Sequence, residues 1–183
     1  MPAMALSGTV RRFEIELSDS DRGVYESLDL RVAQHPSESE RFLVARVLVR
    51  ALEHAEGVEF SKGLGAADEP ALWQHDLQGT LRAWIEVGAP STDRLHKASK
   101  AAPRVAVYGW KAPEVLARGL VEAKVHRAEA IEIHVLDAAL LDAVVGTLDR
   151  NNRWSLSVSG GSLYLDVAGR SFEGLLARVQ VGG

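Results

Sequence analysis

The sequence has no cysteine among its 183 residues. This absence excludes disulfide bonds, thiolate metal sites and cysteine nucleophiles. There is also no run of about 18 apolar residues, so we expect no membrane-spanning helix. Residues 1–6 lack the basic stretch and long apolar segment of a secretory signal. A cytoplasmic location is therefore expected.

Several well-known catalytic patterns are missing as well. The six histidines are not spaced as HExxH, and no GxGxxG, Walker A or GxSxG pattern occurs. Zinc proteases, dinucleotide-binding enzymes, P-loop NTPases and serine hydrolases of the common types are therefore not indicated.

The chain carries a net charge of −4, with 21 basic and 25 acidic residues. Proteins that hold nucleic acid tightly usually present a broad basic field to the phosphates. The one local basic stretch contains Arg94, Lys97, Lys100 and Arg104. Any contact with nucleic acid is therefore expected to be local, and weak or transient.

The first part of the chain predicts a hairpin followed by a helix. Apolar and polar residues alternate over 9–18 and again over 24–33, with a turn at Gly23 between them. Ser37 is suited to cap the next helix, and Glu40, three residues later, completes a capping box. The apolar stripe that follows has helical spacing, and Gly57 is expected to end the helix.

The rest of the chain mixes strands with helices. Strands are expected at 58–62, 81–87, 105–108, 131–136, 154–158 and 163–167, and helices from 91 to 102, 113 to 127 and 138 to 148. The patterns of 72–77 and 172–181 leave their structure open. Residues 1–183 thus predict one α/β domain with an antiparallel amino-terminal hairpin extension.

Two acidic positions surround one of these strands. Asp68 lies in a loop, and Glu86 interrupts an apolar strand. Burying a carboxylate costs free energy unless it is paired or ligates a metal. Mg²⁺ takes oxygen ligands, so Asp68, Glu86 and the backbone carbonyl of Val87 form a candidate magnesium site for phosphodiester hydrolysis.

Such a site usually includes a lysine two residues after the second carboxylate, where side chains of a strand share a face. Gly88 occupies that position. Lys97 and Lys100, on the next predicted helix, are candidates to replace it, and Lys62 is a third.

Each of these residues also has a structural interpretation. Asp68 fits an ordinary loop, and Glu86 is merely solvated if its strand has a wet face. Lys97 and Lys100 fit a solvated helix face, and Glu40 is explained by capping.

Several segments, taken in order, resemble the bacterial YaeQ family. They begin with Ser18–Glu26 and Ala33–Glu38 and continue through Glu59–Leu64, Asp68–Trp73, Trp84–Gly88 and Arg94–Ala98. The resemblance implies a variant of the PD-(D/E)XK nuclease-like fold, with a restriction-endonuclease-like core in which helices flank a mixed sheet. It does not imply one defined activity.

The resemblance also implies roles for individual residues. Asp68 matches the first metal carboxylate and Glu86 the second, while Lys97 would replace the lysine normally found at position 88. Glu40 or Glu38 matches the acidic residue of the first helix.

Two functions remain open. The first is a Mg²⁺-dependent phosphodiesterase in which Asp68 and Glu86 bind metal, Lys97 orients water, and Glu40 gives support. The second is a non-catalytic protein for nucleic-acid handling or transcription that reuses the fold. The negative net charge and Gly88 favour the second function, and the acidic pair with its nearby lysines favours the first.

Overall fold

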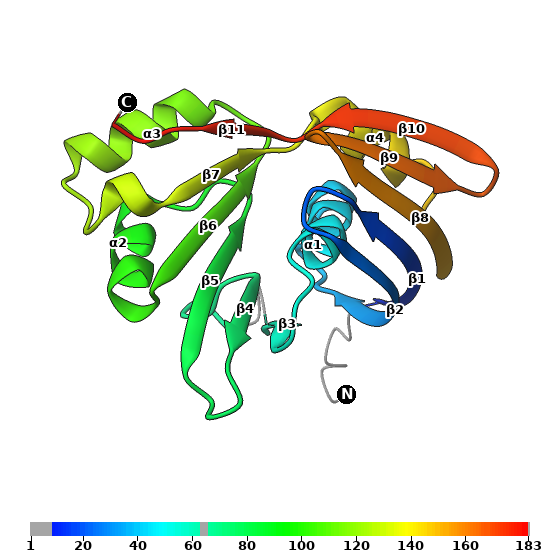
Figure 1. Ribbon diagram of the computed structural model, residues 1–183, viewed down its shortest axis with the longest axis horizontal. Coiled ribbons are helices and arrows are strands. Elements are labelled where there is room, and N and C mark those ends of the chain that lie inside the picture. Colours follow the sequence, from blue (N-terminus) through cyan, green and yellow to red (C-terminus); the bar gives the residue numbers. More distant parts are fainter. Residues whose placement is uncertain (1–8, 63–65, 183) are drawn as a thin grey trace, which may run out of the picture.

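The computed structural model describes residues 9–62 and 66–182. Its strands form two mixed sheets, one of five strands and one of six. Figure 1 shows the sheets on either side of the helix α1 (Glu40–Leu52). Within the described ranges, none of the helices has the length and apolar character needed to cross a lipid bilayer.

The five-stranded sheet has the order β10-β9-β8-β1-β2. Its strands are β1 (Thr9–Asp19), β2 (Val24–Gln34), β8 (Asn151–Ser159), β9 (Ser162–Val167) and β10 (Arg170–Leu175). The predicted amino-terminal hairpin is confirmed, with a φ of 68° at Gly23 in its turn, and the strands expected at 154–158 and 163–167 form a second hairpin.

The amino-terminal hairpin is not an extension of the fold, as the sequence had suggested. β1 pairs in parallel with β8, so that Ile15 lies beside Trp154. The hairpin is therefore half of a sheet that the carboxy-terminal strands complete. Alternation within one strand predicts the strand but gives no information on a partner so distant in sequence.

The six-stranded sheet has the order β11-β7-β6-β5-β4-β3. Its strands are β3 (Val58–Phe60), β4 (Leu72–His75), β5 (Leu81–Val87), β6 (Arg104–Gly109), β7 (Glu132–Val135) and β11 (Ala177–Val179). β5, β6 and β7 are parallel, and the other neighbours are antiparallel. The two segments that the sequence left open thus contain strands.

Helices cover both faces of this second sheet. α1 lies on one face; α2 (Thr92–Ala101) and α3 (Pro113–Glu122) pack on the other, and the short η2 (Ala128–Ala130) precedes β7. α4 (Ala138–Val145) contacts α1 and β10. The predicted helices from 113 and 138 are present but end earlier, and Pro113 occupies the first turn of α3 as expected.

The amino-terminal cap of α1 differs from the prediction. Ser39, not Ser37, is the N-cap, and its hydroxyl accepts a hydrogen bond from the Phe42 amide. The Ser37 hydroxyl instead contacts the His35 ring at 2.7 Å. Both serines precede the same apolar stripe, so spacing alone could not choose between them. The helix also ends at Leu52, five residues before Gly57.

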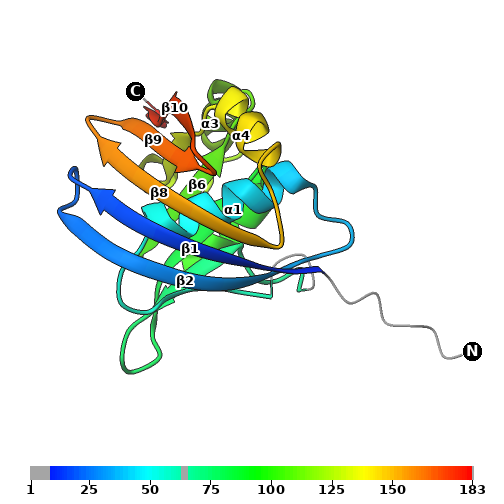
Figure 2. The same cartoon turned by 90° about the vertical axis from the view of Figure 1, so that its right-hand side faces the viewer.

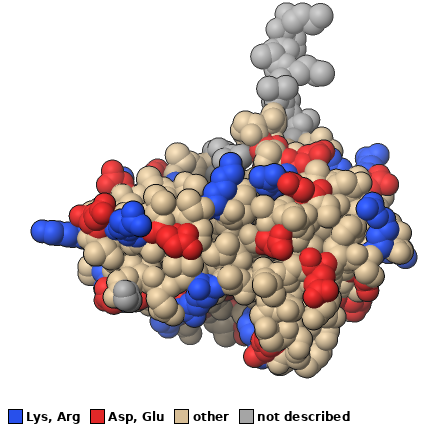
Figure 3. Space-filling model, turned by 90° about the horizontal axis from the view of Figure 1, so that it is seen from above, with Lys and Arg blue, Asp and Glu red and all other residues tan. Residues whose placement is uncertain are grey.

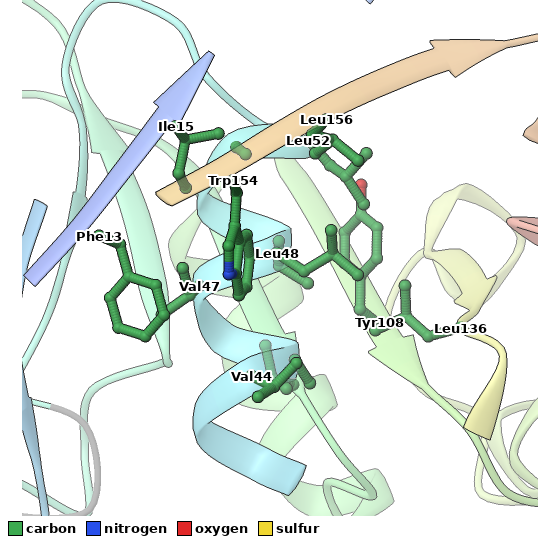
Figure 4. Packing of buried hydrophobic residues seen from close by; sticks show 14 of the residues in the cluster. Phe13, Ile15, Val44, Val47, Leu48, Leu52, Tyr108, Leu136, Trp154 and Leu156 are labelled. Carbon is green, nitrogen blue, oxygen red and sulfur yellow. The ribbon is translucent and has the colours of Figure 1, made fainter. Parts of the chain in front are cut away.

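The main hydrophobic core joins the two sheets through α1. Figure 2 shows the five-stranded sheet lying across this helix. In Figure 4, Phe13, Ile15, Trp154 and Leu156 of that sheet lie around Val47 and Leu48, with Tyr108 of the second sheet nearby. The Phe13 and Trp154 rings meet edge to face, with centroids 5.2 Å apart. α1 therefore packs against both sheets and joins them in one core.

Candidate functional site in the cavity beside Glu86

A cavity of about 660 Å³ opens between β2, the start of α1, β3 and the end of β5. Its walls include four basic and three acidic side chains, contributed by Arg31, Arg46, Lys62, Arg94, Glu38, Glu69 and Glu86. The predicted site residues Glu86, Val87 and Lys62 lie on it, together with Glu38. We call this space the main cavity.

Glu86 is the least exposed of the three acidic residues that line the main cavity. Its neighbours in β5, Ile85 and Val87, join the core around α1, whereas Trp84 packs toward α2 and α3. Glu86 is only 5% exposed. Its Oε1 accepts hydrogen bonds from Trp84 Nε1 at 2.7 Å and from Arg94 Nε at 2.6 Å. The strand therefore has no wet face at Glu86, and the carboxylate is held by charge and hydrogen bonding.

Arg94 fixes both Glu86 and the loop that carries Asp68. It lies in the first turn of α2, whose N-cap Ser91 accepts a hydrogen bond from the Arg94 amide at 3.2 Å. The guanidinium also donates to the carbonyl oxygens of Ala67 and Glu69. One side chain thus connects α2, β5 and the loop before β4, a role the sequence did not reveal.

The loop presents Glu69 to the cavity, not Asp68. The Glu69 Oε2 accepts a hydrogen bond from the Lys62 amide at 3.0 Å, and both residues line the cavity. Asp68 is exposed and is not among the described residues that line this space. The structure therefore brings Glu69, Glu86 and Val87 to one cavity, while Asp68 is exposed in the adjoining turn.

The acidic residue near the first helix is Glu38. It is 7% exposed, and its carboxylate receives two hydrogen bonds from Arg46, at 2.9 and 3.0 Å, and one from the His35 amide. Glu40 has a side chain that is 51% exposed, with Arg11 at 3.7 Å. Of the two acids that the resemblance implied, only Glu38 reaches the main cavity.

The three candidate lysines are placed differently. Lys62 is exposed at the edge of the main cavity and lines it. Lys97 and Lys100 are exposed on α2, and neither belongs to the described lining. Arg94, one turn before Lys97 on the same helix, is the cation that α2 directs to Glu86.

The geometry at Gly88 explains the missing lysine. Gly88 follows the last residue of β5 and has a φ of +97°, so its α-carbon no longer follows the strand alternation. A β-carbon there would lie 3.1 Å from the Phe42 ring, on the α1 side. The expectation that positions 86 and 88 share a face is therefore wrong. A lysine at 88 would be strained and would not follow Glu86.

The acidic residues of the cavity carry oxygen atoms of the chemical type that binds hard cations such as Mg²⁺. The carboxylates of Glu69 and Glu86 are of the ligand type that Mg²⁺ takes, with water completing the shell. Glu86 Oε2 accepts no hydrogen bond within residues 9–62 and 66–182, whereas Oε1 accepts two. Those same ranges contain no group of three or more His, Cys, Asp or Glu side chains arranged for a metal. Any Mg²⁺ would therefore rely on few protein ligands and keep several waters.

A second polar cluster, which the sequence did not predict, lies on a cavity of about 370 Å³ at the carboxy-terminal end of α1. Arg104 donates to both oxygens of Glu53, at 2.7 and 2.9 Å, and to both oxygens of Glu132, at 2.7 and 3.2 Å. Tyr108 donates to Glu53 at 2.5 Å, and His134 contacts Glu132 at 3.2 Å. We call these five residues the Arg104 network.

The Arg104 network changes the ionisation of its members. The hydrogen bond from His134, together with Arg104, lowers the pKa of Glu132 to about 2. Burial, followed by the nearby Glu53 charge, raises the pKa of the Tyr108 hydroxyl well above its usual value. His134 stacks on Tyr108, with centroids 4.4 Å apart, because these residues are register partners of β6 and β7. Only the spacing of residues 104, 108, 132 and 134 along two strands could have hinted at a shared face.

Comparison with known proteins gives consistent matches along the chain. A family model described as "YaeQ protein" matches residues 4–174. The "Uncharacterized protein YaeQ" of Salmonella typhi is 27% identical over 172 residues, covering 93% of this chain and 94% of that protein. The protein of the same description from Escherichia coli (strain K12) is 33% identical over 107 residues, which cover 58% of this chain and 59% of its own length.

Two crystal structures are similar over nearly their whole length. The YaeQ protein from Xanthomonas axonopodis pv. citri superposes with a TM-score of 0.83 at 32% identity, covering 94% of this chain and 97% of that chain. The YaeQ protein from Pseudomonas syringae gives a TM-score of 0.85 at 30% identity, with 96% and 97% coverage. The arrangement of two mixed sheets and helices is thus shared with solved structures.

Proposed function

The chain belongs to the YaeQ family, and we propose that its main cavity is a nuclease-like site that binds a phosphodiester and hydrolyses it with Mg²⁺. The observation that carries this proposal is the Glu86 carboxylate. Glu86 is 5% exposed and lines the main cavity. Its Oε1 accepts two hydrogen bonds, whereas its Oε2 accepts none in the described part of the chain. A buried carboxylate in this state is suited to hold a cation.

The order of elements supports the proposal. α1, β3, β4, β5, α2 and β6 follow one another, with acidic residues in the loop before β4 and inside β5. Apart from β4, this is the order that the sequence predicted from the strands at 58–62, 81–87 and 105–108 and the helix from 91 to 102. We therefore include a restriction-endonuclease-like core in the proposal, built on the six-stranded sheet and its flanking helices.

The residues of the cavity then have distinct roles. Glu69, Glu86 and the Val87 carbonyl would hold Mg²⁺, with Asp68 available from the same turn. When bound, the metal neutralises phosphate charge and lowers the pKa of a coordinated water. Arg94 keeps the Glu86 carboxylate and the 67–69 loop together, and Lys62 is the lysine placed to meet a phosphate oxygen or water in the cavity. Lys97 and Lys100 are assigned to contacts with the nucleic acid outside it.

A non-catalytic binding function is the second candidate, and a specific contact favours it. Arg94 already neutralises Glu86 at 2.6 Å, and Gly88 leaves the strand without the usual lysine. A protein that only binds phosphodiesters needs the arginine and lysine side chains of the cavity, and its Glu86 needs no partner other than Arg94 and Trp84.

Cleavage assays separate these functions. We expect the purified protein to cut single-stranded or duplex DNA or RNA in Mg²⁺ or Mn²⁺, and Glu86→Gln to reduce the rate by on the order of 100-fold or more. Glu40→Gln, which removes an exposed acid outside the cavity, is the matched control and should retain full activity. If the unaltered protein cuts none of these substrates but binds them, the non-catalytic function replaces the catalytic one.

A further inference from the structure

The size of the main cavity limits what can reach Glu86. A space of about 660 Å³ suits one compact ligand, comparable with the pockets that enclose small molecules. Glu86 is buried on its wall, so a phosphodiester must enter the cavity to approach the carboxylate. Enzymes that do chemistry on a base in an enclosed pocket act on a single strand or take the nucleotide out of the stack. A nucleotide that enters this cavity would need to be freed from the stack in the same way.

Two aromatic side chains line the same cavity. Phe60 belongs to β3, and Phe42 belongs to the first turns of α1. The guanidinium carbon of Arg46 lies 5.1 Å from the centre of the Phe60 ring, so a cation supports that ring from one side. Aromatic faces that line a cavity with basic residues are the usual means of holding unstacked bases without regard to sequence.

The charge of the cavity differs from that of the whole chain. Arg46 is paired with Glu38 and Arg94 with Glu86, which leaves Arg31 and Lys62 against Glu69. The chain as a whole carries −4, and the face seen in Figure 3 mixes acidic and basic residues without a field of one sign. The basic side chains that can attract a phosphate are thus Arg31 and Lys62 at the cavity, which a flexible single strand can enter. The face seen in Figure 3 has no comparable field of positive charge.

From these three features we infer that the ligand of the main cavity is one unstacked nucleotide of a single strand. Its base lies against Phe60 and Phe42, and its phosphate lies near Arg31 and Lys62. This inference rests on the proposed function for the class of ligand, and it adds the strandedness and the residues that select it.

Binding in the absence of metal tests the inference separately from catalysis. Fluorescence anisotropy is measured in EDTA with a labelled oligonucleotide of about 12 nucleotides and with the duplex of the same sequence. We expect the single strand to bind at least about tenfold more tightly. Phe60→Leu keeps an apolar side chain but removes the ring, and should weaken single-strand binding about five- to tenfold.

Phe172→Leu is the matched control. The Phe172 ring also has an arginine, Arg170, 5.1 Å from its centre, but it lies in the five-stranded sheet outside the lining of the main cavity. This variant should bind the single strand as the unaltered protein does. Circular dichroism of both variants shows whether each retains the fold.

The outcomes distinguish the two proposals. Equal or tighter binding of the duplex, equal effects of the two phenylalanine substitutions, or no binding of either nucleic acid would overturn the inference. Glu86-dependent cleavage under any of these outcomes leaves the proposed function standing. Conversely, selective single-strand binding that depends on Phe60, without cleavage in Mg²⁺ or Mn²⁺, supports the inference and removes the catalytic proposal.

Discussion

Two carboxylate clusters lie near opposite ends of α1, and they differ in how many of their oxygen atoms accept hydrogen bonds. In the Arg104 network, both oxygens of Glu53 and both of Glu132 have partners. At Glu86, two donors share Oε1, and Oε2 has none in the described part of the chain. A complete network of buried polar groups stabilises a fold, whereas an incomplete one keeps capacity for a ligand. We therefore assign a structural role to the Arg104 network and a ligand-binding role to the cluster around Glu86.

The largest loss of stability is expected when the guanidinium at the centre of the Arg104 network is removed. Arg104→Ala leaves Glu53 and Glu132 without their shared cation, and we expect the free energy of unfolding to fall by about 3 kcal/mol. The value lies at the low end for a buried pair because the Arg104 side chain is 38% exposed. Urea denaturation measures the change.

The control for Arg104→Ala is Arg153→Ala. The Arg153 side chain is 88% exposed and pairs with Glu14, so its loss should cost less than about 0.5 kcal/mol. A loss below about 1 kcal/mol for Arg104→Ala would contradict the structural assignment of the network.

Acid should weaken the Arg104 network in a defined range of pH. The pKa of Glu132 in the folded protein is about 2, below its usual value of 4.5. Its contribution to stability is therefore complete above about pH 4.5 and is lost as the pH falls toward 2. We expect about 2 kcal/mol from this group, reduced from the full shift because Arg104 is partly exposed.

Urea denaturation from about pH 6 downward, with Glu132→Gln in parallel, measures this contribution. The difference in stability between the two proteins should shrink as the pH falls below 4.5. A difference that stays constant over this range would show that the Glu132 charge does not stabilise the fold.

The smallest expected effect concerns a polar atom with no partner at all. Trp154 Nε1 is buried and lacks a hydrogen bond in the described structure. Trp154→Phe removes this donor, which is favourable, but it also leaves unfilled volume beside Phe13. We expect these effects to offset within about 1 kcal/mol, measured by thermal or urea unfolding.

Trp154→Ala should cost about 3–5 kcal/mol, because it removes nearly all of the packing at this position. If Trp154→Phe lowered the free energy of unfolding as much as Trp154→Ala, then Nε1 would donate a hydrogen bond in solution. That result would contradict the expectation that this donor has no partner in the core.

Local patterns in the sequence predicted most of the elements of the fold. Alternation identified β1, β2, β8 and β9, and an acid inside an apolar strand drew attention to Glu86, which is buried and paired with Arg94. These features depend on neighbours in the chain, so one sequence contains the information. The sequence did not show that β1 joins β8, because pairing depends on the whole sheet.

The details of the site were harder to predict for the same reason. Asp68 and Glu69 are adjacent, and which one lines the main cavity depends on the course of the loop that Arg94 holds. Arg94 itself was seen only as part of a basic stretch, because its contact with Glu86 joins two elements. Gly88 was expected to share a face with Glu86, but the positive φ that follows β5 overturned that alternation.

The parallel pairing of β1 with β8 has a consequence for the newly made chain. Ile15 and Trp154, which lie side by side in the finished sheet, are separated by 139 positions. At ribosomal rates of about 5 to 20 residues per second, roughly 7 to 28 seconds pass between the synthesis of one and the other. During that time the first hairpin has an open strand edge and lacks the apolar partners that later cover it. We therefore expect the nascent chain to be most prone to edge-to-edge association before β8 emerges, and a chain that stops before residue 151 to keep that edge of β1 unpaired.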